Sequence, residues 1–164
     1  MMPLDELKNC LRYEPDTGRF IWASAITKSV KKCLIGQEAG VLHHSGYVYI
    51  KIMGKKYAAH RLAWFFVHGE FPQGFLDHIN RNKSDNRISN LRKATRSQNS
   101  ANMRGRSNTG FKGVQKTQGK YTARIRYNYK LRHIGVYATA EEASEAYQKE
   151  AKKLFGDFAG AFSH

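Results

Sequence analysis

Cysteine and long apolar runs are scarce in this sequence, and each scarcity excludes a class of protein. The two cysteines, Cys10 and Cys33, stand apart without a CxxC pair. This pattern argues against a disulfide-stapled secreted fold and against a structural zinc site. No apolar run has the length of a membrane span, and residues 1–5 show no signal-peptide pattern. We therefore expect reduced thiols, no membrane partner and a cytoplasmic location.

Acidic side chains are also few. The chain has 28 lysines and arginines against 13 aspartates and glutamates, which gives a net charge of +15 and a pI near 10. Residues 1–50 hold 6 basic and 5 acidic side chains, residues 51–106 hold 12 and 3, and residues 107–164 hold 10 and 5. Clustered Lys and Arg displace counterions from a phosphate backbone, so the excess predicts a polyanionic partner.

The length and composition allow two compact modules. With 164 residues and 41% hydrophobic side chains, the chain is long for one small domain and short for two large ones. We predict an α+β fold with an N-terminal supporting region at 1–45 and a core module at 46–104. A linker at 105–110 is expected to lead into a second module at 111–160.

Hydrophobic periodicity and turn residues predict the secondary structure. Before residue 46 we expect a helix at 3–11, a strand at 19–22 and an irregular stretch at 23–39. The core module is expected to hold strands at 46–52, 57–60, 75–78 and 88–92, and helices at 61–68 and after Thr95. The second module is expected to hold strands at 111–115, 120–127 and 130–137 and a helix at 140–155.

Two helix starts carry the same sequence signature. Thr95 with Gln98, and Thr139 with Glu142, each match a capping box, in which both side chains satisfy free backbone amides. The first box places Asn99 in the first turns of its helix.

Four polar residues stand at fixed intervals in the most unusual stretch of the chain. Asp77-His78 is followed by Asn90 twelve residues after the histidine and by Asn99 nine residues later. Hydrolysis of a phosphodiester needs a base for water, a cation at the leaving oxygen and a group that holds the base. His78 is the candidate base, and Asn90 is placed to fix it. Asp77 and Asn99 supply oxygen ligands that suit magnesium better than zinc.

This stretch resembles the HNH family of endonucleases, in the variant whose last position is Asn. The resemblance covers residues 45–103 and is closest to phage-borne and homing-type members. It is carried by the strings His60-Arg61-Leu62-Ala63-Trp64, Phe71-Pro72, Asp77-His78-Ile79-Asn80, Asp85-Asn86-Arg87-Ile88-Ser89-Asn90-Leu91-Arg92 and Gln98-Asn99.

The resemblance implies a ββα-metal core built around one divalent ion, Mg²⁺ with Mn²⁺ as the alternative. Asp77 and Asn99 are then the metal ligands, His78 is the general base and Asn90 orients it. Direct hydrolysis would leave a 5′-phosphate and a 3′-hydroxyl, with no small-molecule cofactor beyond the metal. A phage-encoded member would act in the cytoplasm of a bacterial host.

The second module has a cationic sheet. Between Phe111 and Tyr137 there are seven Lys or Arg side chains and no Asp or Glu. In the strand 120–127, Lys120, Arg124 and Arg126 alternate with apolar residues, so one face is expected to be cationic and the other to pack on the helix 140–155. A solvated face usually mixes both signs of charge. The unmixed face therefore predicts contact with DNA, and three-stranded readers of the major groove are a known mode.

The same segment resembles the DNA-binding domain of plant ethylene-response and APETALA-type transcription factors, which also occurs fused to phage HNH nucleases. The match runs through 107–114, 119–126, 134–137 and 140–143. Arg126 and Lys112 fall on base-reading positions of that family. Gln115 and His133 replace its Arg and Trp, so base preference does not carry over. The phosphate contacts, which need only charge, are assigned to Lys116, Lys120, Arg124, Lys130 and Arg132.

Taken together, the patterns predict a metal-dependent endonuclease that acts on double-stranded DNA and is directed by its second module. Arg61 has two interpretations, a phosphate contact or an ion pair on the helix surface. Two alternatives to the whole prediction stay open: a DNA-binding regulator with a silent nuclease core, and a nuclease for RNA or branched DNA. The target sequence, the number of strands cut and the oligomeric state are not determined by these patterns.

Overall fold

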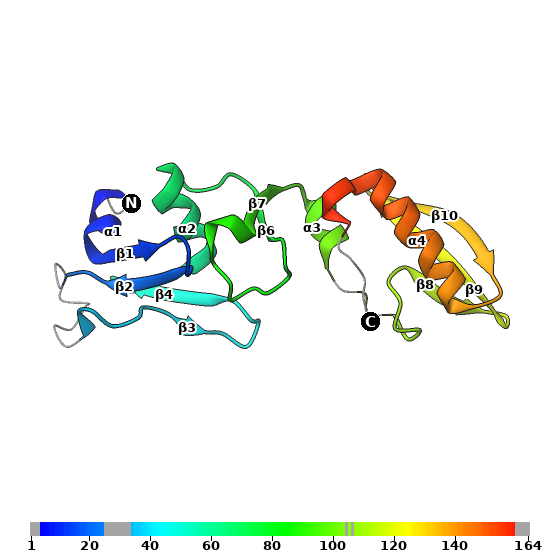
Figure 1. Cartoon of the computed structure of the whole chain (residues 1–164), viewed down its shortest axis with the longest axis horizontal. Helices are drawn as coiled ribbons and strands as arrows, with labels where there is room; N and C mark the ends of the chain where they lie inside the picture. Colours follow the sequence, from blue (N-terminus) through cyan, green and yellow to red (C-terminus); the bar gives the residue numbers. More distant parts are fainter. Residues whose placement is uncertain (1–3, 25–33, 104, 106, 160–164) are drawn as a thin grey trace. The chain divides into compact units, whose positions relative to one another are not determined.

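The computed structural model describes residues 4–24, 34–103, 105 and 107–159 (Figure 1). Cys33 and most of the irregular stretch expected at 23–39 lie outside these residues. The chain forms two compact units, residues 1–93 and 94–164, and each has its own buried apolar residues. The linker expected at 105–110 stays a prediction. No helix in the described part of the chain has the length and apolar character that crossing a membrane requires.

The first unit combines short strands with two helices. Its elements in chain order are α1 Leu4–Cys10, β1 Leu11–Glu14, β2 Arg19–Trp22, β3 Val41–Leu42, β4 Val48–Ile52, β5 Lys55–Ala58, α2 Ala59–His68, β6 Phe75–His78, the 3-10 turn η2 Ile88–Asn90 and β7 Leu91–Ala94. The strands form the antiparallel hairpin β1–β2, the antiparallel sheet β3–β4–β5 and the pair β6–β7.

The core of the first unit follows from the two periodicities of its elements. Ile50 and Ile52 of β4 are two residues apart and therefore share a face, while Leu62 and Phe65 of α2 are one helical turn apart. All four are buried in one cluster with Phe20 of β2. Gly69 ends α2 as predicted, with a φ of 78° that a glycine adopts without strain.

Three predictions for the first unit are wrong. The strand expected at 57–60 occupies Lys55–Ala58, where it pairs with β4, and Ala59 and His60 already belong to α2. The first helix ends at Cys10, and Leu11–Glu14 is a strand because its backbone pairs with Arg19–Trp22, from Leu11 opposite Trp22 to Glu14 opposite Arg19. The strand predicted at 88–92 begins only at Leu91, because residues 88–90 close a 3-10 turn first. Asn90 therefore ends a turn, where its side chain faces the preceding loop.

The second unit is a sheet covered by a helix, as predicted. Its elements are α3 Arg96–Asn102, β8 Val114–Thr117, β9 Lys120–Tyr127, β10 Lys130–Tyr137, α4 Ala140–Phe155 and the 3-10 turn η3 Gly156–Phe158. The strands form one antiparallel sheet in the order β10–β9–β8, and α4 lies across one face of it (Figure 1). The first strand was predicted at 111–115 and instead occupies 114–117.

Local signals fix both helices of the second unit. Thr95 and Thr139 accept hydrogen bonds from the backbones of Gln98 and Glu142, and both capping boxes are complete. The α4 residues Ala143, Tyr147, Ala151 and Phe155 are buried against the sheet. Ala101 of α3 belongs to the same core as Ile125 and Tyr147, which is why α3 groups with this unit. A seven-residue helix depends on such packing, because nucleation alone is unfavourable.

Candidate nuclease site

The predicted Asp-His pair lies at the end of β6, where both side chains are buried. Asp77 is 4% exposed and His78 is 5% exposed. Burial of a carboxylate and an imidazole costs free energy, so such residues are seldom found in a purely structural core. The backbone of Ile79, the next residue, donates a hydrogen bond to the carbonyl of Asn90 at 2.9 Å. The end of β6 is therefore tied to the turn that precedes β7.

Arg92 of β7 holds the carboxylate of Asp77. Arg92 Nε and an Nη donate to the same Asp77 oxygen, Oδ2, at 2.9 and 2.8 Å. The Arg92 side chain is 17% exposed, so both charges are largely removed from water. A buried carboxylate needs such a partner, and the rigid fork of an arginine also fixes the carboxylate's orientation.

Two rings surround His78. The ring of His60 lies with its centroid 5.2 Å from that of His78 in an edge-on arrangement, and the Tyr47 ring lies at 5.9 Å. Burial lowers the pKa of His78, while the side chain of Asn86 and the charge of Asp77 act in the opposite direction. Burial, together with His78 and Arg61, lowers the pKa of His60 to about 3. Both imidazoles therefore favour the neutral form near pH 7.

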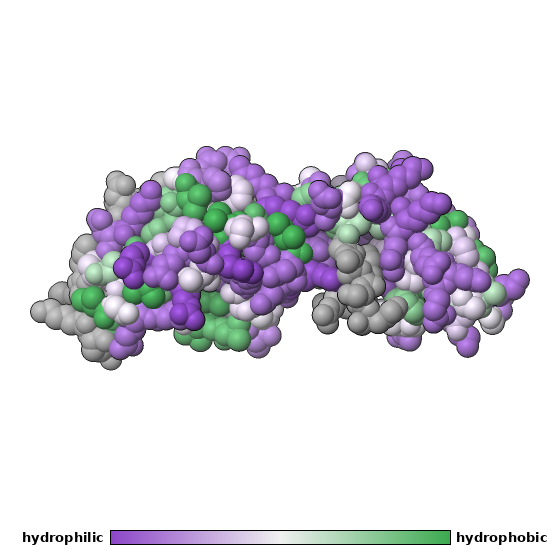
Figure 2. Space-filling view, viewed as in Figure 1, coloured by the Kyte–Doolittle hydropathy of each residue, from purple (hydrophilic) through white to green (hydrophobic). Residues whose placement is uncertain are grey.

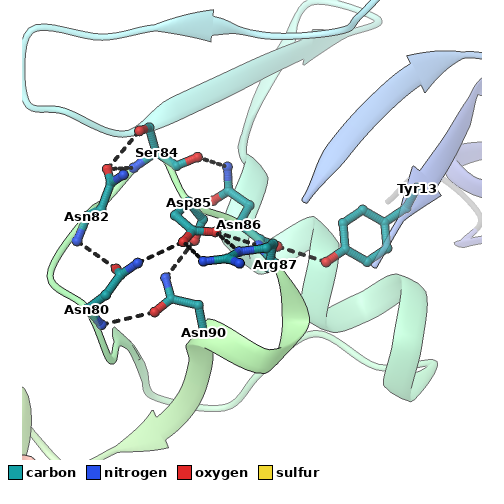
Figure 3. Close-up of polar contacts among 8 residues, drawn as sticks. All are labelled: Tyr13, Asn80, Asn82, Ser84, Asp85, Asn86, Arg87 and Asn90. Carbon is teal, nitrogen blue, oxygen red and sulfur yellow. Dashed lines mark hydrogen bonds and ion pairs between the residues drawn. The ribbon is translucent and has the colours of Figure 1, made fainter. Parts of the chain in front are cut away.

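The loop between β6 and η2 is held by its own polar side chains (Figure 3). Asn80 Oδ1 accepts from the backbone of Asn82 at 2.9 Å, and Asn82 Oδ1 accepts from the backbone of Ser84 at 3.1 Å. Such Asx turns replace a regular ladder of backbone bonds. Asp85 pairs with Arg87 at 2.7 Å, and this hydrogen bond lowers the pKa of Asp85 to about 2.

Asn90 closes this loop from inside. Its Oδ1 accepts from the backbone of Asn80 at 3.0 Å, and its Nδ2 donates to the carbonyl of Asp85 at 2.9 Å. Both ends of the amide thus bind loop backbone (Figure 3). Asn90 is 7% exposed, so removal of either bond would leave a buried polar group unsatisfied. Its predicted effect on His78 would act through the loop.

Asn99 lies on α3, in the second unit, one position after the capping box that starts the helix. The C-terminal end of α3 is capped by Lys112, whose Nζ donates to the carbonyls of Ser100, Ala101 and Met103 at 2.7, 2.6 and 2.7 Å. A cation at a helix C-terminus satisfies carbonyls that have no intrahelical partner. This contact gives Lys112 a structural use that the sequence did not indicate.

The two predicted metal ligands, Asp77 and Asn99, both carry oxygen donors. Asp77 offers a carboxylate oxygen that is buried and oriented beside His78, and Asn99 would offer an amide oxygen, so both donors are hard oxygens of the type that magnesium prefers. In the described ranges, no three His, Cys, Asp or Glu side chains group as a metal site. The predicted metal ligands, Asp77 and Asn99, include only one residue of these four types, so they would not form such a cluster.

The Arg61 side chain binds backbone carbonyl groups of its own chain. Its two terminal nitrogens donate to the carbonyls of Gly74 and Pro72 at 3.0 and 2.6 Å. These bonds fix the segment that leads into β6, and neither of the two predicted contacts of Arg61 is among them.

The basic residues of the second unit divide between the two faces of the sheet. In β9, Lys120, Arg124 and Arg126 are exposed on the side away from α4, whereas Thr122 of the same side is buried. Cross-strand register places Leu131 beside Arg126 on that side. Three other basic residues, Lys116, Lys130 and Arg132, lie directly across the strands from Tyr121, Tyr127 and Ile125. Those β9 residues alternate onto the α4 side of the sheet, so the three basic residues lie on the α4 side as well. Most of the unit's visible surface is hydrophilic (Figure 2).

Comparison with known proteins bears on the core of the chain. A family model described as HNH endonuclease matches residues 57–101, which include Asp77, His78, Asn90 and Asn99. The matched segment, residues 57–101, is called the HNH domain below. The HNH domain ends before the second unit's sheet, so the resemblance of 107–143 to plant transcription factors stays a prediction.

A viral relative extends the match beyond the HNH domain. A protein of Acanthamoeba polyphaga mimivirus, named an uncharacterized HNH endonuclease, is 37% identical over 120 residues. The aligned part covers 72% of this chain and 63% of the relative, so the chain spans less than two thirds of that protein. No solved structure matches the chain.

Sequence reasoning missed several residues around the HNH site. Arg92 binds Asp77, the Asn86 side chain raises the pKa of His78, and His60 packs edge-on to the His78 ring. Arg92, Asn86 and His60 all stand in the strings that carry the family resemblance, which was the signal that could have found them. Their partners are separated by up to 18 residues in sequence, and local spacing does not predict which side chains meet across that interval.

Proposed function

We propose that the chain is a divalent-metal-dependent endonuclease that hydrolyses phosphodiester bonds of double-stranded DNA. The observation that carries the proposal is the buried Asp77-His78 pair at the end of β6, inside an HNH domain. Its carboxylate is oriented by Arg92, and its imidazole favours the neutral form. A positioned neutral base beside a positioned hard-oxygen ligand is what metal-assisted hydrolysis requires.

His78 acts as the general base. Its neutral imidazole takes a proton from the attacking water, and the resulting charge on the ring is favoured by Asp77 and by the Asn86 side chain. Asn90 holds the loop 79–90 through backbone bonds at both of its ends, which keeps the strand end that bears His78 in place. Hydrolysis would be direct, with a 5′-phosphate and a 3′-hydroxyl as products.

Asp77 and Asn99 would hold the metal, Mg²⁺ or Mn²⁺. When bound, the ion supplies charge stabilisation for the phosphate and for the leaving 3′-oxygen. Arg92 keeps Asp77 in one orientation for this task. Asn99 comes from the helix that Lys112 caps, so the cap would steady the helix that bears this ligand.

The second unit would bind the DNA through the side of its sheet away from α4. Lys120, Arg124 and Arg126 are exposed there, and within the described part of this face no carboxylate stands among them. Each phosphate contact adds affinity that falls with salt. Lys116, Lys130 and Arg132 would add charge from the edge strands β8 and β10, whereas the Lys112 ammonium caps α3. A phage or homing-type role, in the cytoplasm of a host, rests on the resemblance.

A plasmid-nicking assay tests the proposal. Wild type, His78→Ala and His44→Ala are incubated with supercoiled DNA and Mg²⁺ or Mn²⁺, and relaxed and linear products are separated on a gel. We expect wild type and His44→Ala to cut, because His44 is exposed and outside the site, and His78→Ala to be inactive. DNA binding without cutting by any variant under either metal would favour a silent regulator. Cleavage of RNA or branched DNA alone would reassign the substrate.

A further inference from the structure

The N-terminal hairpin β1–β2 touches the loop of the HNH site. Its turn, at residues 15–18, lies against the backbone of residues 86–88, more than sixty positions later in the chain. The backbone of Ile88 donates to the carbonyl of Pro15 at 3.3 Å. The hairpin lies outside the HNH domain, yet it contacts the segment that carries Asn86.

Gly18 makes the closest part of this contact. A Cβ atom at Gly18 would lie 2.4 Å from the backbone nitrogen of Arg87 and 2.6 Å from the carbonyl carbon of Asn86. Such distances are far inside van der Waals contact, and both atoms belong to the backbone. Gly18 also has a φ of 73°, which other residues adopt only with strain. The turn therefore fits against the loop only with glycine at this position.

Tyr13 makes a second, directed contact with the same loop. Its hydroxyl donates to the carbonyl of Asn86 at 2.8 Å (Figure 3). The ring is fixed by Phe20, at 4.7 Å between centroids, and by Phe66 at 6.2 Å. Burial raises the pKa of Tyr13 to about 12, so the hydroxyl stays protonated and remains a donor. A rigid aromatic cluster thus holds one backbone oxygen of the loop.

Asn86, whose backbone contacts Tyr13 and Gly18, also influences His78, the proposed general base. Asn86 is 4% exposed, and its Nδ2 donates to the carbonyl of Ser84 at 3.0 Å. The Asn86 side chain also raises the pKa of His78, so the two side chains interact. We propose that Tyr13 and Gly18 are positioning residues of the nuclease site, which set the backbone at Asn86 and thereby the place of His78. The proposal rests on the proposed function. It makes the hairpin 11–22 part of the working nuclease.

The first test removes the Tyr13 hydroxyl and little else. Tyr13→Phe keeps the ring and its packing and deletes the bond to Asn86. We expect kcat for nicking to fall about tenfold, since one directed hydrogen bond to the loop is lost, while KM for DNA stays unchanged. Tyr57→Phe is the matched control, because Tyr57 packs against the same core and its hydroxyl makes no hydrogen bond within the described residues.

The second test enlarges the contact at Gly18. Gly18→Ala is expected to displace the loop and to lower kcat about a hundredfold, as misplacement of a catalytic group by an ångström does. Gly36→Ala is the matched control, since Gly36 has a φ of 83° and no atom within 4 Å of the place that a methyl group would occupy. The control carries the same backbone strain without the clash, so it separates strain from displacement.

Amide hydrogen exchange provides a readout that does not depend on cleavage. We expect the amide of Ile88 to exchange faster in Tyr13→Phe and Gly18→Ala than in wild type and both controls. Wild-type kcat in Tyr13→Phe and Gly18→Ala, with His78→Ala inactive, would overturn the positioning role while leaving the nuclease intact. An inactive wild type would overturn the nuclease proposal, and the positioning role with it.

Discussion

The guanidinium of Arg92 binds one oxygen of the Asp77 carboxylate twice, through Nε at 2.9 Å and through an Nη at 2.8 Å. The two residues face each other across the pair β6–β7, fifteen positions apart in sequence. Asp77 is buried, so its charge depends on this partner more than a surface carboxylate would. The pair therefore stabilises the first unit and orients the residue that is proposed to bind metal.

Arg92→Ala is expected to lower the free energy of unfolding of the first unit by about 3 kcal/mol, because it leaves a buried carboxylate without its cation. Both tryptophans, Trp22 and Trp64, belong to the first unit, so urea unfolding followed by their fluorescence measures it alone. Arg12→Ala is the control. Arg12 pairs with Glu14 on the surface, with side chains 68% and 37% exposed, and should cost less than about 1 kcal/mol. Equal losses in both variants would contradict the buried-pair argument.

His60 is expected to make the first unit less stable in acid. Its pKa in the folded protein is about 3, below the usual 6.5, so the unfolded chain binds the proton first as pH falls. The free energy of unfolding therefore has its full contribution from neutral His60 above pH 6.5. As the pH falls from 6.5 to 3, this contribution declines by about 1.4 kcal/mol per pH unit. Unfolding free energies measured by tryptophan fluorescence at about pH 7 and about pH 5.5 give the slope.

The variant His60→Gln should reduce the mean slope between about pH 7 and about pH 5.5 by about 0.6 proton, whatever its absolute stability. His44→Gln, at an exposed position, should keep the wild-type slope. A wild-type slope in His60→Gln would show that His60 does not titrate at a lowered pKa. The two variants are compared under one buffer and salt condition, since screening alters all surface terms together.

Lys112→Met is expected to loosen α3. The substitution keeps most of the apolar stem and deletes three charge-assisted bonds to the carbonyls of Ser100, Ala101 and Met103. Amide exchange of α3 should become about tenfold faster, and calorimetric Mg²⁺ affinity should fall if Asn99 is a ligand. Lys116→Met, on exposed β8, is the control. Faster exchange with unchanged Mg²⁺ affinity would remove Asn99 from the ligand set.

Arg124→Ala and Arg126→Ala are expected to weaken binding to duplex DNA and to reduce its salt dependence. Each lost phosphate contact should lower the slope of log K against log salt by about 0.9. Fluorescence anisotropy of a labelled duplex between about 50 and 200 mM salt would measure it. Lys149→Ala, an exposed position on α4, should leave the slope unchanged. A slope equal to wild type in Arg124→Ala and Arg126→Ala would exclude this side of the sheet as the DNA contact.

Local signals in the sequence were enough to predict several elements. The capping box at Thr139 placed α4, alternation placed β9 and β10 to the residue, and Gly69 placed the end of α2. These features depend on neighbours within a few positions, because caps and periodicity act over one helical turn or two strand positions. The spacing of Asp77, His78, Asn90 and Asn99 likewise needed no fold to be noticed.

Which side chains meet depends on how the whole chain folds. Arg92 on Asp77, and Lys112 on the end of α3, join residues 9 to 15 positions apart, while Tyr13 reaches Asn86 across 73 positions. Leu11–Glu14 became a strand because Arg19–Trp22 lay beside it, and Asn90 ended a turn because its amide closed the preceding loop. Such contacts come from chain topology, and local propensity carries no information about a partner so far along the chain.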